Sequence, residues 1–249
     1  MMTILSSIQT KLSIQRALYF ILLDPDRFHG ADLEEFANRC GAAGVDGFLV
    51  GGSLMVSGDF DLAIKTLKNL THLPVIIFPG GLSQISPFAD AILFLSIISG
   101  RNPEHLIGKH VIAAPVIKKY GLEAISTGYM LIESGRRTTA EYMSGSMPIP
   151  RHKPEIAVAT ALAAEYLGMK MIYLEGGSGA DNPVPFEMVK AVSKNISIPV
   201  ITGGGIKTPE TAGKMVDSGA KIIVTGNYFE EKINWGMLHE FADAVKGRA

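Results

Sequence analysis

Short apolar runs alternate with amphipathic segments along nearly the whole chain. The runs are rich in Ile, Val, Leu and Phe and lack strict apolar–polar alternation, which is typical of strands buried on both faces. Eight such runs are predicted strands: Leu18–Leu23, Gly47–Val50, Val75–Phe78, Ala91–Leu95, Ile125–Ile132, Lys170–Leu174, Pro199–Thr202 and Lys221–Thr225. The spacing of apolar positions between them predicts helices over Ala31–Ala42, Phe60–Leu70, Pro103–Lys119, Pro154–Leu167, Pro185–Asn195, Pro209–Ser218 and Trp235–Lys246.

The order of these elements predicts a TIM (β/α)₈ barrel that spans residues 1–249 as a single domain. A doubly wound open sheet is the alternative, although it usually has fewer strands. The segment PGGLSQISPFAD, between Phe78 and Ala91, is too short and too rich in Gly, Pro and Ser for a full helix. We therefore expect a modified barrel in which extended chain replaces the third helix. The longest irregular stretch is Glu133–Lys153, and loops of that length usually carry function or contact a partner.

Composition narrows the class of protein. Hydrophobic residues make up 47% of the chain and charged residues 19%, which predicts a large core rather than disorder. A net charge of −1 argues against a general nucleic-acid binder. The single cysteine, Cys40, excludes an internal disulfide and suits a reducing cytoplasm. Met1–Gln15 lacks the apolar stretch of a signal peptide, and no run approaches the roughly 20 residues of a membrane span. We expect a cytoplasmic protein, with peripheral membrane contact left open.

The segment MIYLEGGSGA at 171–180 carries the clearest chemical signal. Tyr173 and Glu175 lie two residues apart in a predicted strand and therefore face the same side. The glycines that follow let backbone amides approach a ligand closely. ITGGGIKTPET at 201–211 and IVTGNYFE at 223–230 also break an apolar run with glycine before a helix. Because the loops after the last strands of such barrels often bind phosphate, the three turns predict a site for a phosphorylated small molecule.

A general base and a cation site are predicted beside this phosphate site. Glu175 is the candidate base, because a partly buried carboxylate at a strand end can accept a proton from a substrate hydroxyl. Tyr173 either orients the substrate or only fills the barrel. Asp24 and Ser53 follow the first two strands and suit Mg²⁺, which takes other ligands from water and substrate phosphates. A turn or capping role stays open for both. The six histidines show no metal-ligand spacing and are expected on the surface or in loops.

The motifs LLDPD, VGGS, FPG, YLEGGSGA, TGGGI and TGN, in this order and spacing, resemble the geranylgeranylglyceryl phosphate synthase family, which includes bacterial heptaprenyl relatives. The resemblance covers Leu18 to Trp235, and the stretch Ser146–Lys170 is similar to the larger of the family's two groups. It implies a Mg²⁺-dependent prenyltransferase, a phosphoglycerol geranylgeranyltransferase of ether-lipid biosynthesis. Such an enzyme joins a prenyl diphosphate to the 3-hydroxyl of sn-glycerol 1-phosphate and releases diphosphate. It also implies a TIM barrel with extended structure in place of the third helix, and a homo-oligomer, either a dimer or a hexamer.

Residue roles follow from the resemblance at the matching positions. Asp24 and Ser53 would hold Mg²⁺ against the diphosphate. Glu175 would deprotonate the attacking hydroxyl, with Tyr173 beside it as the second catalytic residue. The residues that would bind glycerol phosphate are Tyr173, Leu174, Glu175, Gly176, Gly177, Ser178, Gly179, Gly203, Gly204, Thr225, Gly226 and Asn227.

Two further expectations concern the prenyl diphosphate. Leu22 stands where some relatives carry a lysine that faces the barrel, so a phosphate contact must come from elsewhere. Arg27 is a candidate, although arginine and lysine are not equivalent donors. The prenyl chain needs a dry groove on the side without a third helix, and core packing is the alternative for each residue proposed there: Phe78, Pro79, Phe94, Leu95, Ile97 and Ile98.

Three alternative functions remain open. The same reaction with a longer donor, such as heptaprenyl diphosphate, would use the same motifs. A phosphate-binding barrel isomerase or aldolase is a second class, but no strand end shows a convincing Schiff-base lysine. A non-catalytic barrel that binds a phosphorylated ligand is disfavoured, because Asp24, Ser53 and Glu175 are all present.

Overall fold

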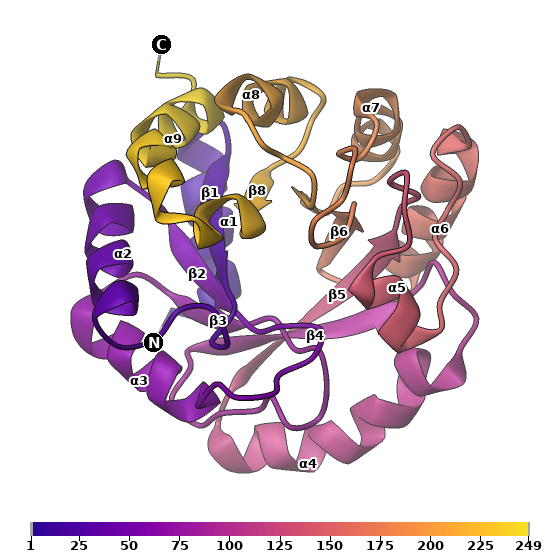
Figure 1. The fold of residues 1–249 in the computed structure, drawn as a ribbon. Coiled ribbons are helices and arrows are strands. Elements are labelled where there is room, and N and C mark those ends of the chain that lie inside the picture. The colour runs from indigo at the N-terminus through magenta and orange to yellow at the C-terminus, as the bar shows by residue number, and fades with distance from the viewer. Residues whose placement is uncertain (1, 249) are drawn as a thin grey trace.

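Among the described residues, 2–248, eight parallel strands close into a barrel in chain order, so that β1 pairs with both β2 and β8 (Figure 1). In this computed structural model the strands are β1 (Leu18–Leu23), β2 (Gly47–Val50), β3 (Val75–Ile77), β4 (Ala91–Ile97), β5 (Glu123–Leu131), β6 (Met171–Glu175), β7 (Val200–Gly203) and β8 (Ile222–Thr225). All eight predicted strands are confirmed, and the predicted TIM barrel with them.

Helices cover the outside of the barrel (Figure 1). They are α2 (Gly30–Ala43), α3 (Phe60–Leu70), α4 (Lys109–Tyr120), α6 (Pro154–Tyr166), α7 (Phe186–Asn195), α8 (Pro209–Asp217) and α9 (Leu238–Lys246). The helix predicted from Pro103 begins with a separate π-helical turn, η1 (Glu104–Gly108), which precedes α4. Two short 3₁₀ turns, η2 (Asn227–Glu230) and η3 (Lys232–Met237), connect β8 to α9.

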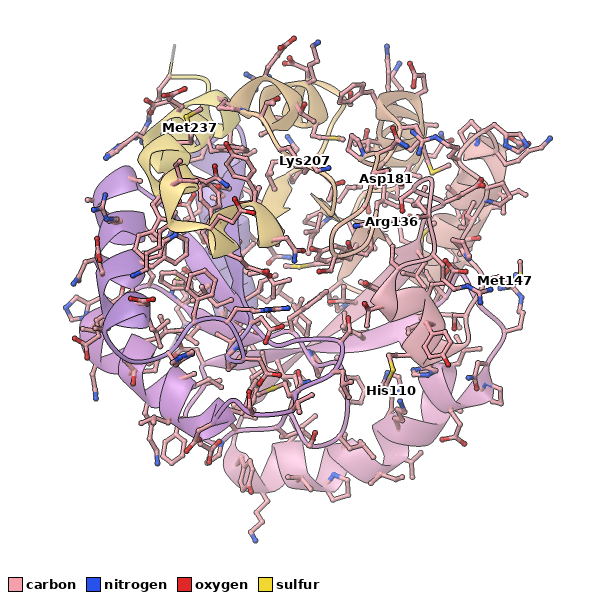
Figure 2. All side chains as sticks on the ribbon, viewed as in Figure 1. His110, Arg136, Met147, Asp181, Lys207 and Met237 are labelled. Atoms are coloured by element: carbon pink, nitrogen blue, oxygen red, sulfur yellow. The ribbon has the colours of Figure 1, made fainter. Side chains whose placement is uncertain are left out.

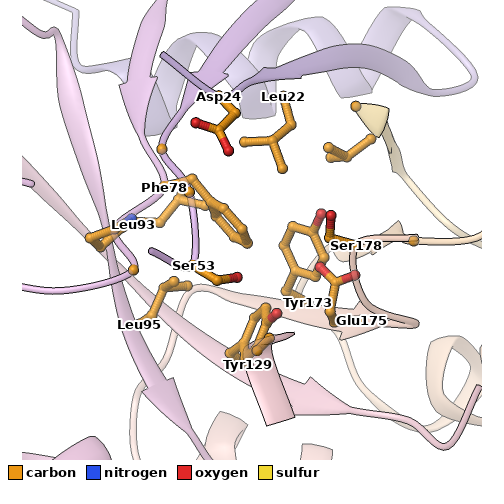
Figure 3. Close-up of a pocket in the computed structure, with 18 of the residues that line it drawn as sticks. Leu22, Asp24, Ser53, Phe78, Leu93, Leu95, Tyr129, Tyr173, Glu175 and Ser178 are labelled. Carbon is orange, nitrogen blue, oxygen red and sulfur yellow. The ribbon is translucent and has the colours of Figure 1, made fainter. Parts of the chain in front are cut away.

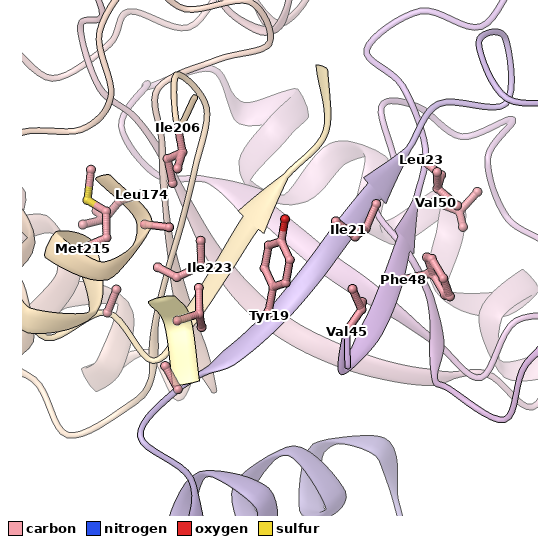
Figure 4. Packing of buried hydrophobic residues seen from close by; sticks show 14 of the residues in the cluster. Tyr19, Ile21, Leu23, Val45, Phe48, Val50, Leu174, Ile206, Met215 and Ile223 are labelled. Carbon is pink, nitrogen blue, oxygen red and sulfur yellow. The ribbon is translucent and has the colours of Figure 1, made fainter. Parts of the chain in front are cut away.

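Alternate residues of each strand belong to two separate apolar layers, one inside the barrel and one between the strands and the helices. On β1, Leu18 and Phe20 point into the barrel, whereas Tyr19, Ile21 and Leu23 point outward beneath the helices. Figure 4 shows the outer layer around Tyr19, Ile21 and Leu23. Since most positions on both faces of the strands are buried, the strands are predominantly apolar in the sequence.

The amino-terminal end of the barrel is closed by α1 (Ile4–Ile14), a helix that the sequence analysis did not predict. Ile8 is buried with the inner strand residues, and Ile4 and Leu5 pack against the same cluster. The amides of Ile4 and Leu5 donate to the carboxylate of Glu123 at the start of β5. The helix therefore seals the end of the barrel opposite the strands' carboxyl ends.

The barrel helix that would follow β3 is missing, as expected. Among the described residues, none between β3 and β4 is α-helical. A buried side chain, Gln84, organises this segment instead. Its Oε1 accepts from the amide of Gly80 at 3.0 Å and from that of Gly52 at 3.3 Å. Its Nε2 donates to the Gly52 carbonyl at 2.7 Å. Gln84 thus ties the loop after β3 to the loop after β2.

The stretch Glu133–Lys153, expected to be irregular, contains one short helix, α5 (Thr139–Ser144). The stretch starts and ends against the sheet, because the Glu133 amide donates to the Ile149 carbonyl and the Ile149 amide to that of Leu131. It therefore forms an excursion above the end of β5, on the same side as the strands' carboxyl ends.

Candidate active site

A cavity of about 460 Å³ opens at the carboxyl ends of the strands, where TIM-barrel active sites lie. Each strand, or the loop directly after it, contributes to its wall. Figure 3 shows Glu175, Tyr173 and Tyr129 gathered on one side of the cavity, with Asp24 and Leu22 across the opening. The same cavity therefore holds the candidate base and the candidate cation ligand.

Glu175 ends β6 inside the barrel, with only 5% of its surface exposed. The amide of Gly177 donates to its Oε1 at 2.5 Å. Burial raises the pKa of Glu175 to about 7, while hydrogen bonds from the Gly177 amide and from the Tyr129 and Tyr173 hydroxyls oppose the rise. A carboxylate that titrates near neutrality suits a general base.

Tyr129 belongs to the site although the sequence analysis did not single it out. The β5–β6 register places it opposite Tyr173, and the two ring centroids lie 5.5 Å apart. Phe78 completes the group, at 5.2 Å from the Tyr173 ring and 5.9 Å from the Tyr129 ring. Burial raises the pKa of both tyrosines, and the charge of Glu175 raises it further, so both stay protonated as hydrogen-bond donors. Finding Tyr129 requires the strand register, which the sequence pattern does not contain.

The loop after β6 is held by loops from both sides. Asn227 Oδ1 accepts from Ser178 Oγ at 2.6 Å and from the Gly179 amide at 3.2 Å. Gly177 has φ +100°, and a Cβ there would lie 2.2 Å from Thr138 Cγ2, so only glycine fits. Backbone amides of this loop are therefore kept at the cavity wall between the loops after β5 and β8.

The turn after β7 packs against the same loop. Gly204 has φ +81°, and a Cβ there would lie 2.4 Å from the Gly177 nitrogen and 2.5 Å from Glu175 Oε1. The predicted phosphate-site residues that line the cavity are Tyr173, Glu175, Ser178, Gly179, Gly204, Thr225, Gly226 and Asn227. The other four are not among the residues that line it: Leu174, Gly176, Gly177 and Gly203. The side chain of Leu174 packs in the outer core, so only its backbone lies at the strand end.

Asp24 and Ser53 both line the cavity, at the ends of β1 and β2. A Cβ on Gly52 would lie 2.9 Å from Asp24 Oδ2, which places the carboxylate against the loop that carries Ser53. Burial raises the pKa of Asp24. Asp26 has a different role: its carboxylate accepts from the amides of Val56, Ser57 and Gly58 and fixes the loop after β2. The structure thus separates one acid that faces the cavity from one that holds the backbone.

Glu230 is a second acid at this end that the sequence analysis did not single out. It is half-buried, lines the cavity and accepts from Asn227 Nδ2 at 2.8 Å. Burial raises its pKa. Arg27 approaches Glu230 at 3.9 Å, but its side chain is 67% exposed and does not line the cavity. Leu22 does line it, as expected of a residue that faces the barrel.

The apolar end of the cavity follows the side without a third helix. Of the predicted groove residues, Ile98 packs against the outer core, and the others line the cavity: Phe78, Pro79, Phe94, Leu95 and Ile97. The groove continues past Ile92 beneath Ala113 and Ile117 of α4, so this helix covers its far part. The expectation that every histidine lies on the surface or in a loop is wrong for His110, which is buried on α4.

Comparison with known proteins identifies the family. Residues 12–245 match the sequence pattern of the PcrB family. The chain belongs to the PcrB family. It is 47% identical over 231 residues to geranylgeranylglyceryl phosphate synthase of Chitinophaga pinensis, a match that covers 93% of this chain and 91% of the relative. The protein of the same name from Thermococcus gammatolerans is 46% identical over 215 residues, which are 86% of this chain and 84% of the relative.

A solved structure similar to this PcrB-family chain is that of (S)-3-O-geranylgeranylglyceryl phosphate synthase from Thermoplasma acidophilum, in complex with its substrate sn-glycerol-1-phosphate. The TM-score is 0.92 at 36% sequence identity, and the match covers 99% of this chain and 100% of the other. The resemblance drawn from the motifs is therefore confirmed.

Two further findings concern membrane-spanning helices and metal-ligand clusters in this PcrB-family chain. Within residues 2–248, no helix combines the length and the apolar character needed to cross a bilayer. In the same part of the chain, no group of three or more His, Cys, Asp and Glu residues could hold a metal ion. A cation at Asp24 and Ser53 would accordingly complete its coordination with oxygens from water or substrate.

Proposed function

We propose that this protein is a prenyltransferase that joins a prenyl diphosphate to the 3-hydroxyl of sn-glycerol 1-phosphate. The observation that carries the proposal is the position of Glu175, a buried carboxylate of pKa about 7 at the wall of a cavity whose neighbouring loops present backbone amides. The bound substrate of the T. acidophilum relative supports the same acceptor. Geranylgeranyl diphosphate is the expected donor, because the relatives are named geranylgeranylglyceryl phosphate synthases.

The acceptor phosphate would bind to the loops after β6, β7 and β8, where Ser178, Gly204 and Asn227 line the cavity. This position directs the glycerol 3-hydroxyl toward Glu175, which accepts its proton. The hydroxyl oxygen then forms a bond to C1 of the prenyl donor as the bond from C1 to the diphosphate oxygen breaks. Diphosphate leaves with the bonding electron pair, and the products are an ether and protonated Glu175. Tyr129 and Tyr173 hold the carboxylate in place through their hydroxyl groups.

We propose Mg²⁺ as the cofactor at the opposite side of the cavity. Asp24 and Ser53 offer a carboxylate and a hydroxyl oxygen, which are ligands that Mg²⁺ prefers. When bound there, the ion would neutralise charge on the leaving diphosphate. Among the described residues these two do not form a complete metal site by themselves, and this fits an ion that is shared with a substrate phosphate.

The prenyl chain would lie in the apolar groove between β4 and α4. Leu95 and Ile97 form its wall near the barrel mouth, and Ala113 with Ile117 covers its inner part. These four side chains are apolar, so burying a hydrocarbon chain against them is favourable, although Lys109 and His110 of α4 also line the cavity.

A transfer assay tests the function. Purified protein with Mg²⁺ and labelled sn-glycerol 1-phosphate is offered prenyl diphosphates of increasing length, from geranyl to heptaprenyl. We expect labelled, organic-soluble product, with the highest kcat/KM for geranylgeranyl diphosphate. A preference for heptaprenyl diphosphate would keep the reaction and change the donor, whereas no transfer with any donor would contradict the proposal.

Two expectations about cellular context remain proposals. A homo-oligomer is supported by apolar side chains exposed on the excursion after β5, where Tyr142 and Met147 are 72% and 77% exposed. Light scattering at micromolar protein concentration measures the molar mass of the assembly, and the mass of a monomer would contradict the proposed homo-oligomer. A cytoplasmic location is supported by the free, buried Cys40.

A further inference from the structure

The charges on the cavity wall are unbalanced for a site that takes two phosphorylated substrates. Four carboxylates line the cavity: Asp24, Glu175, Glu230 and Glu231. Among the described residues, Lys109 and Lys207 are the only lysine or arginine residues that line it. Lys109 begins α4, the helix over the apolar groove, and Lys207 follows the turn after β7.

From this arrangement we propose that Lys207 binds the phosphate group of the acceptor and sets the affinity of the site for it. The inference rests on the proposed function and adds a residue that was not among the predicted phosphate ligands. Figure 2 shows Lys207 on the same side of the barrel mouth as Asp181 in the loop after β6. The turn that leads to Lys207 begins with Gly204, which packs against the nitrogen of Gly177. Lys207 therefore follows, after three residues, a turn that packs against the loop after β6.

The backbone of Lys207 is anchored on both sides. Ile206 is 4% exposed and packs in the outer core, as Figure 4 shows. Thr208 is the N-cap of α8, with its Oγ1 accepting from the Thr211 amide at 3.1 Å. Because both neighbours are fixed, the position of the Lys207 Cα is fixed, and only its side chain has to adjust to a ligand.

The side chain of Lys207 is also available. Among residues 2–248, no ion pair or hydrogen bond holds its ammonium group, and the nearby acid Glu210 is paired with Lys214 at 2.6 Å. The first turn of α8 lies directly after Lys207 and adds positive potential from its amide groups. By contrast, the guanidinium of Arg27 is directed at Glu230 on the rim. Of the two lysines that line the cavity, Lys207 is therefore the one beside the loops proposed to bind the acceptor phosphate.

The test compares Lys207→Met with wild type in steady-state transfer assays. An ion pair that forms equally in the bound substrate and the transition state changes KM and leaves kcat unchanged. We expect the KM for sn-glycerol 1-phosphate to rise about five- to tenfold, with kcat and the KM for the prenyl diphosphate unchanged. Lys207→Arg should restore most of the affinity. Lys190→Met, which removes an exposed lysine of α7 outside the cavity, is the matched control and should behave as wild type.

Two readouts separate phosphate binding from a structural effect. The KM of wild type should rise with salt concentration, and that of Lys207→Met should rise much less. The pH profile of kcat should be the same in Lys207→Met as in wild type, because the pKa of Glu175 is set by burial, the Gly177 amide and the two tyrosine hydroxyls. An unchanged acceptor KM in Lys207→Met, or a change confined to the donor KM, would overturn the inference. Calorimetry with sn-glycerol 1-phosphate alone tests Lys207 even if no prenyl transfer is found, so the two proposals can fail separately.

Discussion

Opposing effects on the Glu175 carboxylate hold its pKa at about 7, near neutrality. Burial inside the barrel disfavours its charged form, and the Gly177 amide with two tyrosine hydroxyls favours it. At neutral pH a large fraction of the group is ionised and able to accept a proton. The balance explains why a fully buried acid at this position suits proton transfer.

Glu175→Gln keeps the shape of this side chain and removes its basicity. We expect kcat to fall by about 10² to 10⁴, the usual contribution of a general base. Binding of sn-glycerol 1-phosphate, measured by calorimetry, should stay within about threefold of wild type, because the loop amides remain. Undiminished turnover in this variant would remove Glu175 from the role of base.

Tyr129→Phe tests the hydrogen bond that sequence analysis did not foresee. The hydroxyl of Tyr129 lowers the pKa of Glu175, so its removal should raise that pKa above its value of about 7. Since the base acts when ionised, the acidic limb of the kcat/KM profile should shift to higher pH. Tyr142→Phe, at an exposed position on α5, is the control. A limb that stays in place or moves to lower pH would contradict the account.

Among the site residues, the sequence predicts those whose facing follows from strand alternation. Tyr173 and Glu175 face the cavity together because they lie two residues apart on one strand. Tyr129 and Lys207 come to the same cavity from other parts of the chain, through strand register and loop packing that no local pattern records. The side chain of Leu174 faces away from the cavity for the same reason of alternation.

Among the elements, the segment between β3 and β4 shows how the barrel does without a helix. Gln84 makes three hydrogen bonds there and is 3% exposed. Its loss removes this partner from the amides of Gly52 and Gly80 and from the Gly52 carbonyl, in bonds that are partly buried. The position of Ser53, next to Gly52, depends on this contact.

Gln84→Ala should therefore destabilise the protein by about 1–3 kcal/mol, because it removes three hydrogen bonds made by a buried side chain. Thermal unfolding measures the change, and the transfer assay should show a higher Mg²⁺ requirement because Ser53 is less well held. Gln9→Ala, at an exposed position of α1, is the control. Equal melting temperatures for the two variants would show that Gln84 does not organise this segment.

The predicted elements agree with the structure best where burial is complete. The bounds of β1 and β2 match, because strands covered on both faces form continuous apolar runs. Among residues 2–248, two α-helices escaped prediction, α1 and α5. The second is only six residues long, too short for an apolar period to show, although Thr138 caps its start and Gly145 its end.

Across the whole molecule, the two reacting groups are assigned to opposite sides of one cavity. The acceptor side is formed by β6, β7 and β8, and the cation side by β1 and β2. This division predicts that each side can be impaired without the other. The closed barrel keeps the sides in register, since every strand is bonded to two neighbours.

Asp24→Asn tests that division. The loss of one ligand charge should raise the Mg²⁺ concentration for half-maximal activity by about tenfold or more. Affinity for sn-glycerol 1-phosphate, measured without donor, should not change. An unaltered Mg²⁺ dependence would remove Asp24 from the cation site.

The most direct test of the central claim counts both products of a single transfer. Wild-type protein is incubated with Mg²⁺, geranylgeranyl diphosphate and labelled sn-glycerol 1-phosphate, with labelled sn-glycerol 3-phosphate in a parallel sample. We predict one diphosphate released for each labelled molecule that becomes organic-soluble, and little transfer to the 3-phosphate. Diphosphate release without incorporation of label, or neither product, would contradict the account.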